Sequence, residues 1–343
     1  MATETITKSA VEREKRAVLA APVAEPLSPA TKALIAGLLV FALVAPFVLY
    51  PIYLIKVLCF ALFACAFNLL IGYVGLLSFG HAMFFGGASY FTGHIVKVWG
   101  WSTELSILAG TLAAGLMGLV AGSIAIRRQG IYFAMVTLAL AQMFYFFCLQ
   151  APFTGGEDGI QAIPRRPLFG IIDLRNDVNL YYVVLAIFLF GFLVVYRAIH
   201  SPFGQVLKSI RENEPRAVSL GYKTDQYKLL AFTLSATLAG LAGATKAIAF
   251  QIASLTDVAW QMSGEVVLMT LVGGIGTVFG PVVGAAVIVT MQNYLAGFGE
   301  WVLVIQGAIF VVVVLLFRRG IVGEAMAYAE RRRRREEEKK AGD

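Results

Sequence analysis

Long, uninterrupted runs of apolar residues dominate this chain, and short polar segments separate them. A helix needs about 20 apolar residues to cross the hydrocarbon core of a membrane, whereas the strands of a membrane barrel would alternate apolar and polar residues. The pattern therefore predicts an all-α, polytopic membrane helix bundle of about ten spans. The expected spans are residues 33–50, 52–71, 80–97, 104–126, 131–149, 180–197, 228–250, 263–275, 279–296 and 299–317.

The eighth run, 263–275, is short and ends in glycines. It either spans the membrane or forms a re-entrant hairpin with the ninth run, which would give nine spans. Of the 28 Lys and Arg residues, 22 lie in four segments: the start up to Lys32, the pair Arg127–Arg128, the stretch Arg197–Lys228 and the end from Arg318. Basic residues gather on the cytoplasmic side. Placing both termini in the cytoplasm puts all four segments there and requires an even number of spans, so we expect ten.

Composition supports the membrane assignment, because 59% of the residues are hydrophobic and only 14% are charged, against about 25% in a soluble domain. Residues 1–32 mix charges with prolines and contain no apolar core of a signal peptide. We expect a disordered cytoplasmic tail over 1–32, a transmembrane domain over 33–320 and a charged cytoplasmic tail over 321–343. Within the domain, loop 150–179 is expected outside and loop 198–227 inside.

Polar residues inside apolar spans are costly and often functional. We take six of them as candidates to line a translocation path, with hydrogen bonds between helices as the alternative role. Glu265 and Lys246 lie near the outer ends of their helices, where long side chains reach the headgroups. The six candidates are Asn68, Ser78, His81, Thr137, Gln142 and Thr270.

Glycines that recur every four residues predict close contact between helices. One such series is Gly276, Gly280 and Gly284, and a second is Gly118 and Gly122. The sequence contains no catalytic motif, and we expect no catalytic residue, metal or cofactor. No lysine follows a glycine directly, so no Walker A loop is present. Active transport would therefore take its energy from a partner or an ion gradient.

The segment Ser201–Tyr222 is a polar island between two apolar runs. Ser201 and Pro202 predict the start of a helix, and Val206, Leu207 and Ile210 give it an apolar stripe. Pro215 is expected to break this helix. A second helix is expected from Arg216 to Leu220, ending at Gly221. The mixed charge of the whole segment favours a protein partner over a lipid surface, because lipid-bound helices usually carry a more uniformly basic face.

Five segments of the chain carry, in order, sequence motifs of one family. They are NLLIGYVGLLSFGHAMFFGGASY (Asn68–Tyr90), GIYFAMVTLALAQ (Gly130–Gln142), TGGEDGI (Thr154–Ile160), SPFGQVLKSIRENEPRAVSLGYKTDQYKLLAFTLSATLAGLAGA (Ser201–Ala244) and GEVVLMTLVGGIGTVFGPVVGA (Gly264–Ala285). With these motifs, residues 35–325 resemble the permeases of branched-chain amino-acid ABC importers of the LivM type.

The resemblance implies a type II-like ABC importer permease in the bacterial inner (plasma) membrane, which is not itself an enzyme. Its implied partners are a second, LivH-like permease, two cytoplasmic ATP-binding subunits, a periplasmic substrate-binding protein and membrane lipid, with no nucleic acid. The implied substrates are branched-chain or related hydrophobic amino acids, and urea, amides or aromatic acids are the alternatives. The alternative class is an ion-coupled secondary transporter, which would need carboxylates or broken helices near the bilayer midplane.

The resemblance also implies that loop 198–227 is the coupling element that docks on an ATPase. Charged residues at the rim of such a contact set its register more than its affinity. The residues expected to form or shape it are Gly204, Arg211, Glu212, Asn213, Glu214, Arg216 and Gly221.

Overall fold

The computed structural model describes residues 29–295, 297, 301–316, 320–325 and 327–328. By its internal contacts the chain divides into two units, Met1–Ala45 and Pro46–Asp343. The described part of the first unit belongs to helix α2 (Pro29–Val48). Because α2 already begins at Pro29, whose fixed φ suits a first helical turn, the predicted tail is four residues too long. Residues 1–28 of the predicted N-terminal tail and residues 329–343 of the predicted C-terminal tail lie outside the described residues.

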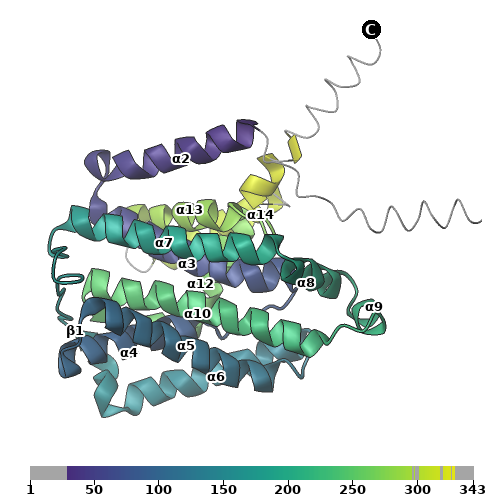
Figure 1. The fold of residues 1–343 in the computed structure, drawn as a ribbon, viewed down its shortest axis with the longest axis horizontal. Coiled ribbons are helices and arrows are strands. Elements are labelled where there is room, and N and C mark those ends of the chain that lie inside the picture. Colours follow the sequence, from purple (N-terminus) through teal and green to yellow (C-terminus); the bar gives the residue numbers. More distant parts are fainter. Residues whose placement is uncertain (1–28, 296, 298–300, 317–319, 326, 329–343) are drawn as a thin grey trace, which may run out of the picture. The chain divides into compact units, whose positions relative to one another are not determined.

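The described part of the second unit is mostly helical (Figure 1). Its helices are α3 (Pro51–Tyr73), α4 (His81–His94), η1 (Ile95–Trp99), α5 (Thr103–Ala125), α6 (Ile131–Gln150), η2 (Pro152–Thr154), η3 (Gly156–Asp158), α7 (Asp177–His200), α8 (Pro202–Glu212), α9 (Glu214–Ser219), α10 (Thr224–Phe250), α11 (Leu255–Val258), α12 (Trp260–Gly273), α13 (Gly280–Leu295) and α14 (Trp301–Leu316). Two short strands, β1 (Ile160–Gln161) and β2 (Ile252–Ala253), pair antiparallel.

A helix covers most of each of the ten predicted apolar runs. Among the described residues, five helices are long and apolar enough to cross a membrane: α3, α5, α6, α7 and α10. Helices α4 and α12 have only 14 residues each and α13 has 16. Ten spans therefore remains a prediction.

Helices α3 and α10 lie at the centre of the second unit and contact α4, α5, α7 and α13 between them. Small residues allow the close approach that this packing requires. A Cβ at Gly243 of α10 would clash with the carbonyl oxygen of Phe85 in α4, and a Cβ at Gly122 of α5 would lie 2.8 Å from the ring of Phe232 in α10. The expectation that Gly118 and Gly122 face a neighbouring helix is confirmed, since a Cβ at Gly118 would clash with Ala236.

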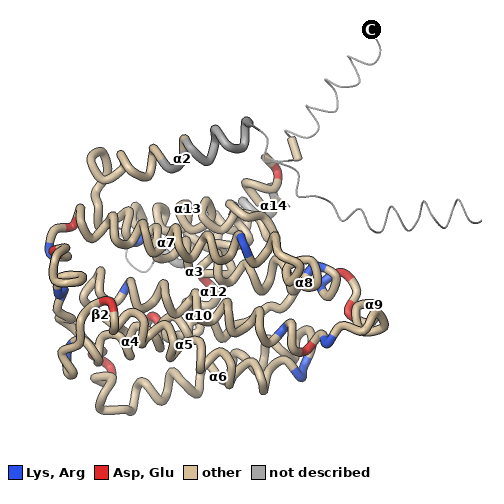
Figure 2. Tube along the Cα trace, in the orientation of Figure 1, with Lys and Arg blue, Asp and Glu red and all other residues tan. Residues whose placement is uncertain are grey.

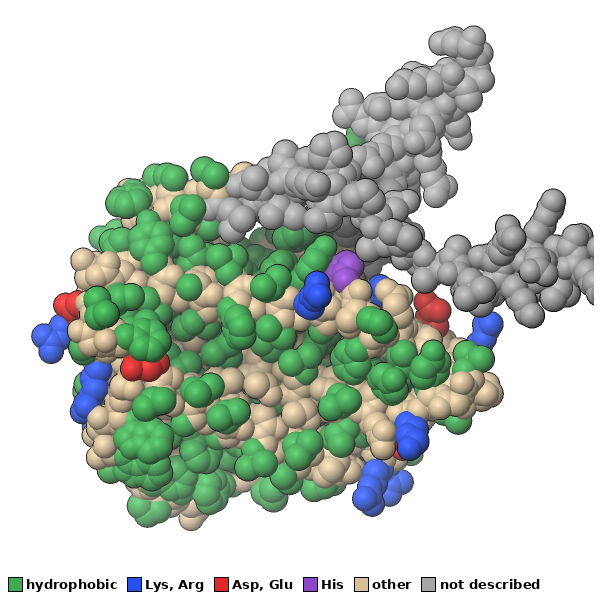
Figure 3. Space-filling view, viewed as in Figure 1, with side chains coloured by type: hydrophobic (Ala, Val, Ile, Leu, Met, Phe, Trp, Pro, Cys, Tyr) green, Lys and Arg blue, Asp and Glu red, His purple; other side chains and the backbone are tan. Residues whose placement is uncertain are grey.

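Charged residues of the second unit gather at the two ends of its helices, whereas its side in the view of Figure 3 is mostly hydrophobic (Figures 2 and 3). We call the end that carries residues 150–179 the loop end, and the end that carries α8 and α9 the short-helix end. At the loop end, β1 joins this segment to β2 directly after α10. Arg165 of the same segment donates hydrogen bonds to Asp177 (3.0 Å) and to the Ala249 carbonyl oxygen (2.5 Å). The segment is therefore a folded cover over the helix ends.

Candidate functional site

The short-helix end carries the predicted helix–break–helix element, α8 followed by α9. Val206, Leu207 and Ile210 of α8 are buried, as their spacing predicts. The break lies at Asn213, which has an extended backbone and accepts a hydrogen bond from the Arg216 backbone N–H (3.1 Å). The prediction that Pro215 breaks the helix is wrong by two residues. Proline lacks only an N–H that the first turn of a helix leaves unpaired, so it fits inside the start of α9.

Helix α9 starts at Glu214 and ends at Ser219, earlier at both ends than predicted. Gly221 follows with a φ of +90°. The backbone N–H of Tyr222 reaches the carbonyl oxygen of Ala217 (3.2 Å), and that of Gly221 reaches Val218 (2.9 Å). This hydrogen-bond pattern is a Schellman motif, which favours glycine at the left-handed position.

Two predicted coupling residues bind to the rest of the chain rather than pointing away from it. The Arg211 guanidinium donates a hydrogen bond to the Gly72 carbonyl oxygen near the C-terminus of α3, where the helix dipole favours a cation. Glu214 forms an ion pair with the buried Lys228 of α10. It also accepts a hydrogen bond from Gln129 Nε2 (3.2 Å), in the turn between α5 and α6. The element is thus tied to both central helices.

The outer face of α9 presents apolar side chains that the sequence analysis did not select. Val218 is 54% exposed, and Leu220, which caps the C-terminus of the helix, is 68% exposed, whereas Ala217 directly before Val218 is buried. The charged side chains of Glu212 and Arg216 are exposed on the same element. The signal in the sequence is that Val218 and Leu220 are apolar although they lie in a polar loop and outside its predicted buried stripe.

Gly204 is buried where α7 meets α8, and a Cβ there would lie 2.6 Å from the Ala198 carbonyl oxygen. The seven predicted coupling residues thus divide into three groups. Arg211 and Glu214 anchor the element, Gly204, Asn213 and Gly221 shape its backbone, and Glu212 and Arg216 face outward.

The candidate path residues on α3 and α4 bond to distant parts of the chain. Asn68 donates to the Thr277 carbonyl oxygen (2.9 Å) and accepts from the Gly276 backbone N–H (3.0 Å). It therefore holds the turn between α12 and α13. His81 Nε2 lies 2.9 Å from Ser235 Oγ of α10. The His81 ring packs edge-on against aromatic side chains, including Phe67 at 5.0 Å between ring centroids.

Ser78 and Thr270 bond to residues close to them in the sequence, whereas Thr137 of α6 bonds to the segment before α4. Thr137 Oγ1 accepts a hydrogen bond from the Phe79 backbone N–H (3.2 Å), and Ser78 Oγ accepts one from Gly80 (3.2 Å). Thr270 donates to the Val266 carbonyl oxygen one turn earlier in α12 (3.0 Å). Gln142 is half-buried on α6. Hydrogen bonding within the chain thus accounts for five of the six candidates.

The predicted glycine stripe is wrong for Gly276, which lies in the turn between α12 and α13 with a φ of +76°. A spacing of four residues cannot distinguish a turn from a helix. Gly280 and Gly284 do lie on α13 and face α12. A Cβ at Gly280 would be 2.9 Å from the Gly273 carbonyl oxygen, and one at Gly284 would clash with that of Met269.

Lys246 does not reach the headgroups, and that prediction is wrong. Its ammonium lies 2.5 Å from both carboxylate oxygens of Asp257 in α11. The exposed fractions of the two side chains are 13% and 3%. Asp257 lies in a loop between predicted spans, so its role was missed.

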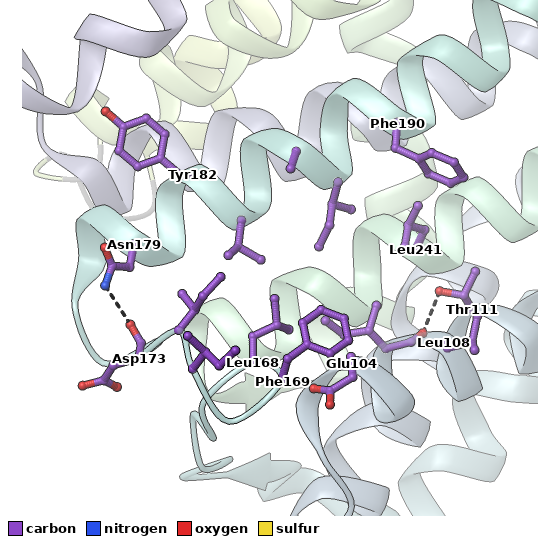
Figure 4. Close-up of a pocket in the computed structure, with 16 residues that line it drawn as sticks. Glu104, Leu108, Thr111, Leu168, Phe169, Asp173, Asn179, Tyr182, Phe190 and Leu241 are labelled. Atoms are coloured by element: carbon purple, nitrogen blue, oxygen red, sulfur yellow. Dashed lines mark hydrogen bonds between the residues drawn. The ribbon is translucent and has the colours of Figure 1, made fainter.

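A groove of about 930 Å³ lies between α5 and α7, with Leu241 of α10 on its wall (Figure 4). Its lining is apolar except for a few polar groups, among them the carboxylates of Glu104 and Asp173. None of the candidate path residues lines this groove. Among the residues that the structure describes, no group of three His, Cys, Asp or Glu side chains could hold a metal ion.

Comparison with known proteins agrees with these features. The family model described as "Branched-chain amino acid transport system / permease component" matches residues 49–314. Two curated relatives, from Escherichia coli (strain K12) and Salmonella typhimurium (strain LT2), are each named "High-affinity branched-chain amino acid transport system permease protein LivM". Each is 26% identical over 277 residues, which cover 74% of this chain and 65% of the relative.

The aligned part therefore spans about two-thirds (65%) of the length of these relatives. No solved structure matches the chain. The family match covers well over half of the sequence and includes α3 to α13 together with the α8–α9 element. The chain therefore belongs to the family of permease components of branched-chain amino acid transport systems.

Proposed function

We propose that this chain is an inner-membrane permease subunit of an ABC importer that forms part of the path for branched-chain or related hydrophobic amino acids. Family membership and the names of the two relatives support this substrate class. ATP hydrolysis takes place on separate subunits, and a periplasmic binding protein delivers the substrate. A second, LivH-like permease completes the path.

In this proposal the chain has ten spans and both termini are cytoplasmic. The loop end then faces the periplasm and the short-helix end faces the cytoplasm. The turn between α12 and α13 supports a spanning eighth segment, because it bonds to Asn68 of α3. Asn68 is 17 residues from the start of α3 at Pro51, a rise of about 25 Å. The turn between α12 and α13 thus lies deep along α3, toward the end opposite Pro51, as expected for a spanning eighth segment.

The anchored α8–α9 element carries the coupling proposal. In the proposed mechanism, closure of the ATPase dimer moves α9. The bond from Arg211 to Gly72 transmits this motion to α3, and the ion pair from Glu214 to Lys228 transmits it to α10. Since α3 and α10 are the central helices, their displacement opens the bundle alternately toward the two faces. Val218 and Leu220 supply the apolar contact with the ATPase, and charges around them set its register.

The test is Leu220→Asp in the complex reconstituted with its partner subunits. An apolar hot spot contributes about 2 kcal/mol or more, so the ATPase should bind roughly 30-fold more weakly or worse. ATP-dependent uptake should fall with it while chain abundance stays constant. The matched control is Ile171→Asp, which alters an 86% exposed apolar residue at the loop end and should leave ATPase binding unchanged.

Unchanged ATPase binding and uptake in Leu220→Asp and Val218→Asp would count against the docking role. Purification of the wild-type chain with whatever binds to it distinguishes an ABC importer from an ion-coupled transporter. A chain that copurifies with no ATPase, and whose uptake a protonophore abolishes in the presence of ATP, would be an ion-coupled transporter instead.

A further inference from the structure

A polar face lies at the loop end of α3, α12 and α13, and the coupling proposal does not use it. Its members are half-buried: Tyr53 and Lys56 on α3, Glu265 on α12, and Thr290 and Gln292 on α13. Gln292 Nε2 donates a hydrogen bond to Glu265 Oε2 (3.1 Å), and the hydroxyl groups of Tyr53 and Thr290 bond to each other. The three helices therefore present their polar side chains to a common region.

Lys56 is the unmatched member of this face. Within the part of the chain that the structure describes, its ammonium has no hydrogen bond and no ion pair within 4.0 Å. The charges that act on it are the attractive one of Glu265 and the repulsive one of Lys246. Asp257 already holds the Lys246 ammonium at 2.5 Å. Lys56 and Glu265 thus influence each other through space but leave a gap between them.

Both charges lie below the ends of their helices. Lys56 lies five residues after the start of α3, and Glu265 lies five residues after the start of α12. Five residues of helix correspond to a rise of about 7.5 Å. Charged side chains within spans almost always face the bundle interior or a water-filled cavity. A cation and an anion held apart on one polar face match a ligand that carries the two opposite charges on neighbouring atoms.

We propose that Lys56 and Glu265 bind the zwitterionic head group of an α-amino acid as it enters the path from the loop end. Lys56 binds its carboxylate, and Glu265, held in place by Gln292, binds its ammonium. Such charge-assisted hydrogen bonds are the strong kind. This site rests on the proposed function and deepens it, because it assigns recognition of the charged head group to the permease. A lipid headgroup that carries an ammonium and a phosphate has related chemistry, and the experiment separates the two sources.

The test uses Lys56→Cys in the complex reconstituted with its partner subunits. The three native cysteines, Cys59, Cys65 and Cys148, are buried and free, so a polar thiol reagent should label the new thiol selectively. Loss of the ammonium should slow uptake of limiting leucine roughly tenfold. Aminoethyl methanethiosulfonate places an ammonium back at the site and should restore most of the rate. The sulfonatoethyl reagent adds a negative charge and should not.

Ligand protection identifies the occupant. Saturating leucine should slow labelling of Lys56→Cys several-fold, whereas isoamylamine, which lacks the carboxylate, should not. The matched control is Lys97→Cys, an exposed lysine at the same end, where neither reagent should change uptake and leucine should not protect. Protection that follows the phosphatidylethanolamine content of the liposomes instead of leucine would assign the site to lipid and overturn the proposal.

Two further results would also overturn it. One is wild-type uptake in Lys56→Cys without leucine protection, because the ammonium would then have no role in binding. The other is loss of the second permease from Lys56→Cys during purification, because Lys56 would then be an interface residue. Failure of the proposed function has a different signature, since the wild-type complex itself would not take up leucine.

Discussion

The ion pair between Lys246 and Asp257 is the most deeply buried one described and offers a sharp test of the fold. The Lys246 ammonium touches both carboxylate oxygens at 2.5 Å, and the Asp257 side chain is only 3% exposed. Asp257→Asn keeps the size of the side chain and removes its charge. The remaining ammonium would then be buried without a counter-charge, because α11 packs directly on α4. A Cβ at Gly86 would lie 2.8 Å from the Asp257 carbonyl oxygen, so α11 has no room to move.

Removing one partner of a buried ion pair typically costs about 3–5 kcal/mol. The cap that the Asp257 side chain provides at the start of α11 should survive, since the side-chain oxygen of Asn can still accept the hydrogen bond from the Ser254 backbone N–H (3.4 Å). We therefore assign the whole loss to the unpaired charge. A loss of this size is a large fraction of the roughly 5–15 kcal/mol that stabilises a typical protein.

The assay is unfolding of the purified chain in mixed detergent micelles, followed by tryptophan fluorescence. The control is Asp158→Asn, which removes an exposed carboxylate at the same end and should change the free energy of unfolding by less than about 0.5 kcal/mol. The double variant Lys246→Met with Asp257→Asn removes both charges and should recover most of the loss. A single variant as stable as the control, or a double variant no better than the single one, would refute the reasoning.

Two further predictions concern helix packing. Gly243→Val should lower the yield of folded protein, with a loss of about 1–3 kcal/mol or more, because its side chain would clash with the Phe85 carbonyl oxygen. The matched control is Gly264→Val, since a Cβ at Gly264 meets nothing within 4 Å, and equal yields of the two would refute the packing argument. Asn68→Ala should speed hydrogen exchange of the turn 274–279, because two hydrogen bonds of about 1 kcal/mol each hold that turn. Unchanged exchange in this segment would show that Asn68 does not hold it.

Features that depend on neighbouring residues could be predicted from the sequence. Each apolar run contains a helix, because the runs are long and polar or glycine-rich segments bound them. The helix–break–helix element was also expected, since Pro202 and Gly221 have local conformational preferences that act without tertiary contacts. The break lies at Asn213 rather than at Pro215, because the Asn213 side chain caps the start of α9. The position of Pro215 alone does not determine where the break falls.

The sequence by itself thus determined the membrane class, the family and the helical order, because these depend on composition, periodicity and motifs along the chain. Only the tertiary structure decided which polar residues meet. Lys246 bonds to Asp257, Arg211 to Gly72, and Asn68 to a turn more than 200 residues away. No periodicity encodes such pairs, because each follows from how two helices pack and at which height they cross. For the same reason, the gap between Lys56 and Glu265 emerged only once α3, α12 and α13 were placed side by side.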